Sequence, residues 1–189
     1  ERNHIHGIFA IHTGILKIYK TGMEGKEQIV KFVKQGDIIG FRSVLSGDLA
    51  CTTAEMLEDG ILEYIPKSVL LNLMQNNFMF TAALIRLICR ELGEANEFIT
   101  DIAQKSVKQR LAEALILLKQ TFDTDDEGIL QVALTREELA NIVGTASESV
   151  IRLLASFKAE GLIALSGRKI RILREQELRR IGNIPERYS

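Results

Sequence analysis

The segment from residue 134 to 173 constrains the fold of this chain most, because its sequence predicts two helices joined by a tight turn. Thr135 followed by Glu138 is a capping box, which satisfies free backbone N–H groups at a helix start. Gly144 tolerates the positive φ that is needed where one helix ends and the next begins at a steep angle. A second helix is predicted from about Ser147 to Lys158, with Val150, Leu153, Leu154 and Phe157 on its buried face.

A short β-hairpin is predicted after the second helix. Gly161 ends that helix, and two runs that alternate in polarity, Leu162 to Leu165 and Lys169 to Leu173, flank the turn dipeptide Ser166-Gly167. Two helices followed by a hairpin form a winged helix-turn-helix, and in such motifs the second helix enters the major groove of DNA.

The outward face of the second helix and the hairpin tip carry the candidate DNA contacts. They are Thr135, Ser147, Glu148, Ser149, Ile151, Arg152, Arg168 and Lys169. Arg152 can donate to guanine O6 and N7, and Glu148 can accept from the cytosine amino group. Ser147, at the helix start, can bind a phosphate. Three alternatives stay open: a capping box between Thr145 and Glu148, a solvated surface charge at Arg152, and hairpin charges that serve solubility only.

The charge distribution argues against indiscriminate binding of nucleic acid. The 189 residues have a formal net charge of −1, so a basic surface must be local. Residues 1–127 hold 14 Lys and Arg against 18 Asp and Glu, whereas residues 128–189 hold 10 against 7. Positive charge is therefore concentrated in the part that carries the predicted helix-turn-helix.

The first third of the chain alternates short apolar runs with glycine turns. Strands are predicted at Gly14–Lys20, Glu27–Val33, Ile38–Gly40, Cys51–Leu57 and Ile61–Ile65, with a short helix at Phe41–Ser46 and another that Pro66 opens. Short strands at regular spacing predict an antiparallel barrel or roll. Because the sequence is already strand-like by Ile5, we expect the roll to be truncated on its N-terminal side.

A long helix from about Asn77 to Ala103 is predicted next. Its apolar stripe consists of Phe78, Thr81, Ile85, Ile88, Leu92, Ala95, Ile99 and Ile102. The steps alternate three and four, which is the period of a two-stranded coiled coil and predicts a parallel homodimer. The alternative is a helix buried against its own domain. A new amphipathic pattern begins near Ser106, so we expect a hinge there and three parts, 1–75, 76–105 and 106–189.

Several other classes of protein and site are not expected. Cys51 and Cys89 lack metal-type spacing and are expected to be small buried hydrophobic side chains. His4, His6 and His12 have no Cys or carboxylate at ligand spacing, so no metal site is predicted. The chain has neither a Gly-x-Ser-x-Gly motif nor a phosphate-binding glycine loop with Lys, which argues against an enzyme. Without a signal peptide or a bilayer-length apolar segment, we expect a cytoplasmic protein with no membrane partner.

A roll, a dimerisation helix and a winged helix-turn-helix in this order resemble the Crp-Fnr family of bacterial transcription regulators. GIFAIHTGILKIYKTGMEGKEQIVKFVKQGDIIG is similar to the family's effector domain, and VGTASESVIRLLASFKAEGLI to its recognition helix. The resemblance implies an α+β homodimer that binds double-stranded DNA at an inverted repeat. The family commonly has Arg-Glu-Thr-Val and then Arg two residues later, where this chain has Ser147, Glu148, Ser149, Val150 and Arg152. We therefore do not expect it to recognise the family's best-known operator unchanged.

The resemblance also places a candidate effector pocket. Its residues are Gly40, Phe41, Arg42 and Ser43, and Cys51, Thr52 and Thr53. Relatives that bind cyclic AMP have a Glu for the ribose hydroxyl and an Arg for the cyclic phosphate at the places of Phe41 and Cys51-Thr52. A phenyl ring cannot accept a hydrogen bond from a hydroxyl, and neither Cys nor Thr offers the charge-assisted bonds of Arg. Cyclic AMP in the usual pose is not expected, although Arg42 and Ser43 could hold another anion.

The remaining expectations concern an iron-sulfur cluster, the effector, and RNA polymerase or another protein as a partner. Two cysteines cannot ligate an iron-sulfur cluster within one subunit, so no cluster is expected and the effector stays unknown. Activation of transcription would require contact with RNA polymerase, and no residue type or spacing marks that surface. A second function class also stays open, namely a ligand-sensing homodimer whose winged domain binds a protein. Salt dependence separates the two classes, because binding to DNA phosphates weakens steeply with salt.

Overall fold

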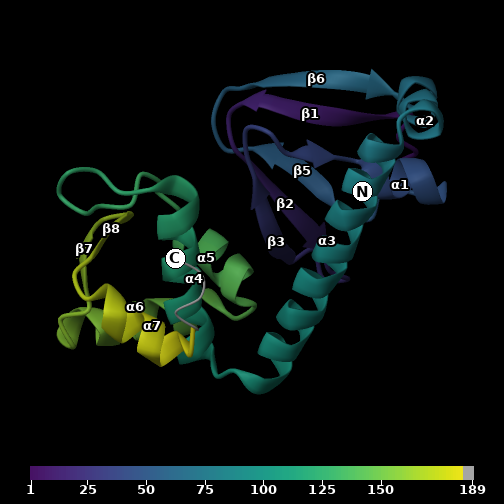
Figure 1. Ribbon diagram of the computed structural model, residues 1–189. Helices are drawn as coiled ribbons and strands as arrows, with labels where there is room; N and C mark the ends of the chain where they lie inside the picture. The colour runs from purple at the N-terminus through teal and green to yellow at the C-terminus, as the bar shows by residue number, and fades with distance from the viewer. Residues whose placement is uncertain (185–189) are drawn as a thin grey trace. The chain divides into compact units, whose positions relative to one another are not determined.

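The computed structural model describes residues 1–184 of the chain. It divides into two compact units, Glu1–Glu97 and Phe98–Ser189 (Figure 1). Strands lie mainly in the first unit and helices in the second, which confirms the predicted α+β class. Residues 185–189 of the predicted third part lie outside the described residues.

The first unit is an antiparallel roll. Its strands are β1 (Gly7–Thr13), β2 (Leu16–Thr21), β3 (Glu27–Val33), β4 (Ile38–Ile39), β5 (Thr53–Met56) and β6 (Ile61–Pro66), and its short helices are α1 (Phe41–Ser46) and α2 (Lys67–Asn76). They form two three-stranded sheets, ordered β4-β1-β6 and β3-β2-β5, in which all pairs are antiparallel. The predicted roll is therefore confirmed, and β1 adds a strand that the sequence did not delimit.

Two apolar clusters fill the roll. One consists of Ile11, Leu16, Ile18 and Val33, and the other of Ile8, Phe41, Val44, Leu70 and Leu84. Phe41, at the start of α1, is only 4% exposed and belongs to the second cluster. The short helix α1 is thus attached to the roll through its first residue, and the Phe41 ring is part of the core.

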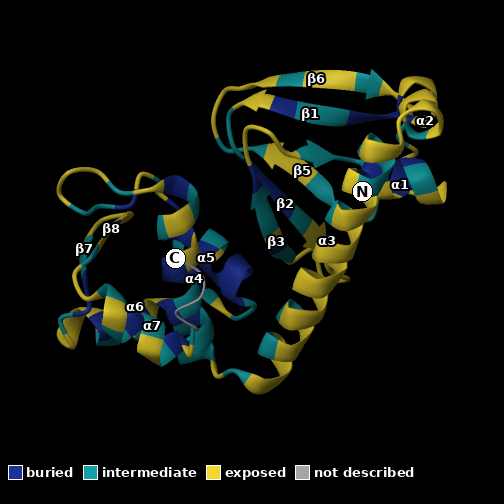
Figure 2. Cartoon of the chain, in the orientation of Figure 1, coloured by how far each residue is buried: buried dark blue, intermediate teal, exposed yellow. Residues whose placement is uncertain are grey.

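The long helix is α3 (Phe78–Gln104), one residue offset from the predicted range. Its two faces differ. Leu84 is buried, and Phe80 and Leu87 pack against the same cluster of the roll. The predicted stripe lies on another face and is solvent-exposed, with exposed fractions of 54% at Ile85, 62% at Leu92 and 65% at Ile99 (Figure 2). The alternative of a stripe buried against its own domain is therefore wrong.

The second unit is a helical domain with a small β-hairpin. Its elements are α4 (Val107–Phe122), α5 (Arg136–Val143), α6 (Ser147–Ala159), β7 (Ile163–Ser166), β8 (Lys169–Ile172) and α7 (Glu175–Gly182). Its core contains Leu115, Leu139, Val150, Phe157 and Leu178, each fully buried. Ser106 caps α4 through a capping box with Gln109, so the predicted hinge lies where one helix ends and the next begins. Helix α7 was not predicted.

The division of the chain into compact units and the burial of the two cysteines can be compared with the expectations. The last residues of α3 group with the second unit, so the division between the two compact units falls inside this helix. The three predicted parts, 1–75, 76–105 and 106–189, stay a prediction. Cys51 is half-buried and Cys89 is exposed, so the expected burial of both cysteines was wrong. Cys89 lies beside the exposed stripe of α3, where no core covers it.

Among residues 1–184, no helix combines the length and the apolar character that crossing a bilayer requires.

Candidate nucleic-acid interface

The helix-turn-helix forms as its local sequence predicts. The Thr135 hydroxyl accepts from Glu138 N at 3.1 Å, and the Glu138 carboxylate accepts from Thr135 N at 2.7 Å. This capping box begins α5, and the Thr135 hydroxyl also donates to the same carboxylate at 2.8 Å. Gly144 ends α5 with a φ of 70°, as the turn requires. Thr135 thus has a structural role, while its contact with DNA stays a prediction.

Helix α6 packs on α5 through one face. Val150, Leu154 and Phe157 are buried at 0%, 1% and 0% exposure. The N-cap is Ala146, whose side chain makes no capping hydrogen bond, so α6 begins one residue later than the alternative capping box between Thr145 and Glu148 requires. Glu148 lies in the first turn, where its charge favours the helix dipole without serving as a cap.

The opposite face of α6 is open to solvent. Glu148, Ile151 and Arg152 are exposed, and Ser147 and Ser149 are half-buried at the helix start. Ile151 is 52% exposed although it is a large apolar residue. These five are the positions of α6 among the eight that the sequence predicted for DNA contact, and their contacts with DNA stay a prediction. Their side chains bring together a guanidinium, a carboxylate, two hydroxyls and an apolar group on one helix face.

The hairpin β7–β8 forms the wing, with one shift from the prediction. Ser166 pairs with Lys169, so the turn residues are Gly167 and Arg168 rather than Ser166 and Gly167. Gly167 has a φ of 59° and stands first in the turn, which is where glycine is favoured in a two-residue hairpin. Arg168 and Lys169 are both exposed at the tip.

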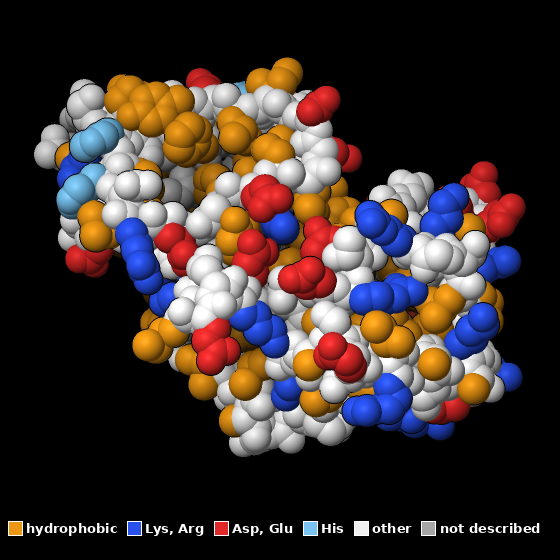
Figure 3. All heavy atoms as spheres, turned by 180° about the vertical axis from the view of Figure 1, so that it is seen from behind, with side chains coloured by type: hydrophobic (Ala, Val, Ile, Leu, Met, Phe, Trp, Pro, Cys, Tyr) orange, Lys and Arg blue, Asp and Glu red, His pale blue; other side chains and the backbone are white. Residues whose placement is uncertain are grey.

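Two contacts of the wing escaped the sequence prediction. Arg136 Nη2 donates to the Gly167 carbonyl at 2.9 Å, which ties the wing tip to the start of α5. Ile129 forms an isolated β-bridge with Arg171, and Leu130 N donates to the Ile170 carbonyl at 2.9 Å, so the segment before α5 is joined to β8. Both contacts join residues more than 30 positions apart, and no local pattern signals them. Figure 3 shows Lys and Arg side chains spread over the visible face of this unit.

The residues predicted for an effector pocket lie in the first unit, and the structure brings only some of them together. The Arg42 guanidinium contacts the sulfur of Cys51, which joins the two predicted stretches. Gly40 caps α1 with a φ of 88°, and Ser43 is buried. Phe41 belongs to a buried apolar cluster of the roll, and its place in an effector pocket stays a prediction. Thr52 and Thr53 are half-buried.

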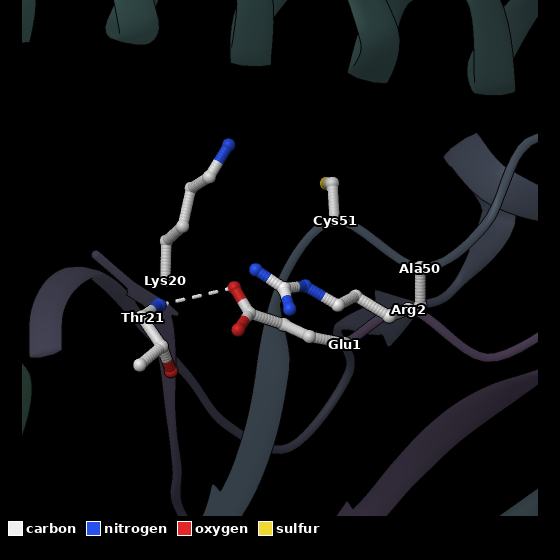
Figure 4. A pocket seen from close by; sticks show the side chains of 6 residues that line it. All are labelled: Glu1, Arg2, Lys20, Thr21, Ala50 and Cys51. Carbon is white, nitrogen blue, oxygen red and sulfur yellow. Dashed lines mark hydrogen bonds between the residues drawn. The ribbon is translucent and has the colours of Figure 1, made fainter. Parts of the chain in front are cut away.

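A cavity of about 220 Å³ adjoins Cys51. It is lined by Glu1, Arg2, Lys20, Thr21, Ala50 and Cys51 (Figure 4). The Glu1 carboxylate accepts from Thr21 N at 3.0 Å, and this hydrogen bond lowers the pKa of Glu1. Of these residues only Cys51 was predicted. Lys20 and Thr21 lie on β2, and Glu1 and Arg2 at the start of the sequence, so all four are distant in sequence from the predicted stretches. Among residues 1–184, no three His, Cys, Asp or Glu side chains lie close enough together to hold a metal ion.

Comparisons with known proteins agree with this architecture. Residues 1–77 match the cyclic nucleotide-binding domain, and residues 109–181 match the Crp-like helix-turn-helix domain. The fumarate and nitrate reduction regulatory protein of Vibrio cholerae is 28% identical over 184 residues, which cover 95% of this chain and 72% of the relative. The CRP-like cAMP-activated global transcriptional regulator of Mycobacterium tuberculosis is 27% identical over 175 residues, covering 92% and 78%.

Solved structures show the same fold. FixK2 from Bradyrhizobium japonicum has a TM-score of 0.82 at 22% identity, covering 96% of this chain and 89% of its own. A CRP/FNR-family transcriptional regulator from Thermus thermophilus has a TM-score of 0.76 at 24% identity, covering 94% and 88%. With both domains matched in the order of the Crp-Fnr regulators, this chain belongs to the Crp-Fnr family of transcription regulators.

Proposed function

We propose that this DNA-binding transcription regulator acts as a homodimer that presents two copies of α6 to the two halves of an inverted repeat. The observation that carries the proposal is the outward face of α6, where Glu148, Ile151 and Arg152 are exposed while Val150, Leu154 and Phe157 of the same helix are buried. A helix with its apolar face buried and chemically diverse groups outside is suited to the major groove.

Each exposed group has a defined partner chemistry. The Arg152 guanidinium suits guanine O6 and N7, and the Glu148 carboxylate suits the cytosine amino group. Ile151 lies between them in the sequence and offers an apolar contact for a thymine methyl. Ser147 and Ser149, together with Arg168 and Lys169 of the wing, are assigned to phosphates, which position the protein on the duplex without selecting a sequence.

The exposed stripe of α3 supports the dimer. Ile85, Leu92 and Ile99 repeat at coiled-coil spacing and are more than half exposed. A row of apolar side chains in water is unfavourable, and a second copy of the same helix would bury it. The proposed partners are thus a second copy of the chain and double-stranded DNA.

The proposed effector is not cyclic AMP in the usual pose. Phe41 has its ring in the core, and Cys51 and Thr52 stand where relatives that bind this nucleotide have the phosphate-binding arginine. The lining of the cavity beside Cys51 holds two cationic side chains, Arg2 and Lys20, against one carboxylate, Glu1, whose oxygen already accepts from Thr21 N, so the excess positive charge suits an anionic group.

Selection from a pool of duplexes with a randomised central region tests this function. The expected product is an inverted repeat whose half-site centres lie about 34 Å apart, one turn of DNA. A variant with Glu148→Ala and Arg152→Ala is selected in parallel, and we expect it to enrich no defined sequence. If the unmodified protein enriches no sequence, or binds DNA with no salt dependence, the proposed DNA recognition is wrong.

A further inference from the structure

One arginine at the start of α4 contacts the ends of two other helices. Arg110 Nε donates to the carbonyl of Val143 at 2.9 Å, and Nη2 donates to that of Gly144 at 3.4 Å. Arg110 Nη1 donates to the carbonyls of Ile102, at 3.2 Å, and Lys105, at 2.8 Å. A single guanidinium therefore donates to four backbone carbonyls. All five residues belong to the second unit, so these contacts do not depend on the arrangement of the two units.

The four carbonyls lie at or just beyond helix C-termini. Helix α3 ends at Gln104, between Ile102 and Lys105, and α5 ends at Val143 with Gly144 as its C-cap. Carbonyls in the last turn of a helix lack intrahelical partners and form the negative end of the helix dipole. A guanidinium satisfies them well because its five N–H donors lie in one rigid plane, whereas lysine has three donors on one nitrogen.

The contacts fix the turn that leads into the recognition helix. Gly144 lies three residues before Ser147, where α6 begins. Its carbonyl is held by the same side chain that holds the last turn of α3. A second set of contacts supports this junction, since Lys105 Nζ lies 2.9 Å from both Asp101 Oδ2 and Glu113 Oε2. The turn that precedes α6 is thus linked to the end of α3 through one arginine.

We propose that Arg110 is a positioning residue that sets the direction of α6 relative to the end of α3, and through it the half-site spacing that the dimer accepts. This inference rests on the proposed function, because spacing has meaning only for a dimer on an inverted repeat. Each base pair added between half-sites moves the second one by about 3.4 Å and rotates it by about 34°. A fixed junction accepts one spacing, and a loose junction accepts several.

The experiment measures affinity for the selected inverted repeat and for versions whose centre is one or two base pairs shorter or longer. The variants are Arg110→Lys, which keeps the charge, and Arg110→Gln, which keeps an amide donor. Arg179→Lys is the matched control, because Arg179 is a half-buried arginine of the same unit that bonds Glu175 in α7. For the unmodified protein and the control, we expect a loss of about tenfold or more on changing the centre by two base pairs.

For Arg110→Lys, we expect about tenfold weaker binding to the best site and less than about threefold difference among the spacings. Circular dichroism and sedimentation check that the variant is folded and dimeric. A folded, dimeric variant with the unmodified spacing preference overturns the proposal. If both Arg110 variants fail to fold while Arg179→Lys folds, Arg110 is a folding residue and the positioning role is also overturned. Failure of the unmodified protein to bind any inverted repeat contradicts the proposed function itself.

Discussion

At the scale of single residues, Arg152 and Lys169 carry the same charge but have different expected roles, because they lie on different elements. Arg152 lies on the outward face of α6, while Lys169 lies at the wing tip on β8. A helix face in the major groove reaches base edges, whereas a wing tip reaches the phosphate backbone. The contributions of Arg152 and Lys169 should therefore differ more in the sequence specificity of the protein than in its affinity for DNA.

Arg152→Ala is expected to weaken binding to the selected site by about 1 to 3 kcal/mol and to relax the preference at one base pair per half-site. Loss of a bidentate contact to one base removes discrimination at that base only. Lys169→Ala serves as the comparison, because it should weaken binding to all sequences alike. Competition binding with single-base-pair variants of the site measures both effects, and an equal loss on specific and random DNA would exclude Arg152 from base recognition.

At the scale of elements, local signals predicted structure well and long-range contacts were missed. The capping box of Thr135 and the positive φ of Gly144 involve neighbours only, so the helix-turn-helix followed from the sequence. The contacts of Arg110 with Val143 and Gly144 span 33 and 34 positions and follow only from tertiary packing. The burial of Phe41 has the same origin, since its ring packs on Ile8 and Leu84 from other elements.

Helix α3 combines two apolar faces, and only the mainly exposed face was predicted. Leu92→Glu places a charge in the middle of the exposed stripe. Burying a leucine contributes about 1.5 to 3 kcal/mol, and the substitution occurs twice in a dimer, so we expect the dimer to weaken more than about a hundredfold. Sedimentation equilibrium measures how far the mass of the variant falls below that of the dimer, which is twice 21.2 kDa.

Leu117→Glu is the control for Leu92→Glu. Leu117 is a leucine of similar type on α4, 43% exposed, and it does not belong to the stripe. Its variant should remain dimeric at the same concentration. Retention of the dimer by Leu92→Glu would show that α3 does not form the interface.

Helix α7 is attached to α4 by a carboxylate whose charge depends on pH. Glu175 Oε2 accepts from Lys119 Nζ at 2.6 Å, and Oε1 accepts from Arg179 Nε at 2.8 Å. The hydrogen bond from Lys119, together with that from Arg179, holds the pKa of the Glu175 carboxyl below its usual value despite partial burial. The stabilisation is therefore complete above the unfolded pKa, about 4.3, and is lost as pH falls through the folded value.

Glu175→Gln should lower the free energy of unfolding by about 1 kcal/mol at pH 7 and have less effect at pH 3. Urea unfolding followed across this pH range measures the difference between the variant and the unmodified protein. Glu177→Gln on the same helix is the control, because its ion pair with Arg180 is longer, at 3.4 Å, and more exposed. A pH-independent difference for Glu175→Gln would contradict the charge argument.

At the scale of the whole molecule, the order of the parts along the chain could be predicted. The roll, the long helix and the helix-turn-helix each have a distinct sequence pattern. Their order along the chain could therefore be predicted from the alternating strands, the heptad-like spacing and the capping box, respectively. The division between units falls inside α3, a continuous helix whose last turn is tied to α4, because the Ile102 carbonyl accepts from Arg110. The bridge between Ile129 and Arg171 depends on such packing and follows from no local pattern, whereas the short helix α7 carries acidic residues in its first turn and basic residues in its last, a signal that the prediction missed.

The two-fold symmetry of the proposed dimer makes each charge of the wing count twice in DNA binding. The whole chain has a net charge of −1, so affinity must come from local cations rather than from overall attraction. The logarithm of affinity should fall linearly with the logarithm of salt concentration, with a slope of about −0.9 per phosphate neutralised. Arg168→Ala removes one cation per subunit, so we expect the slope to become less negative by about 1.8. Lys34→Ala, an exposed lysine of the first unit, should leave the slope unchanged, and an unchanged slope for Arg168→Ala would show that the wing tip does not bind phosphate.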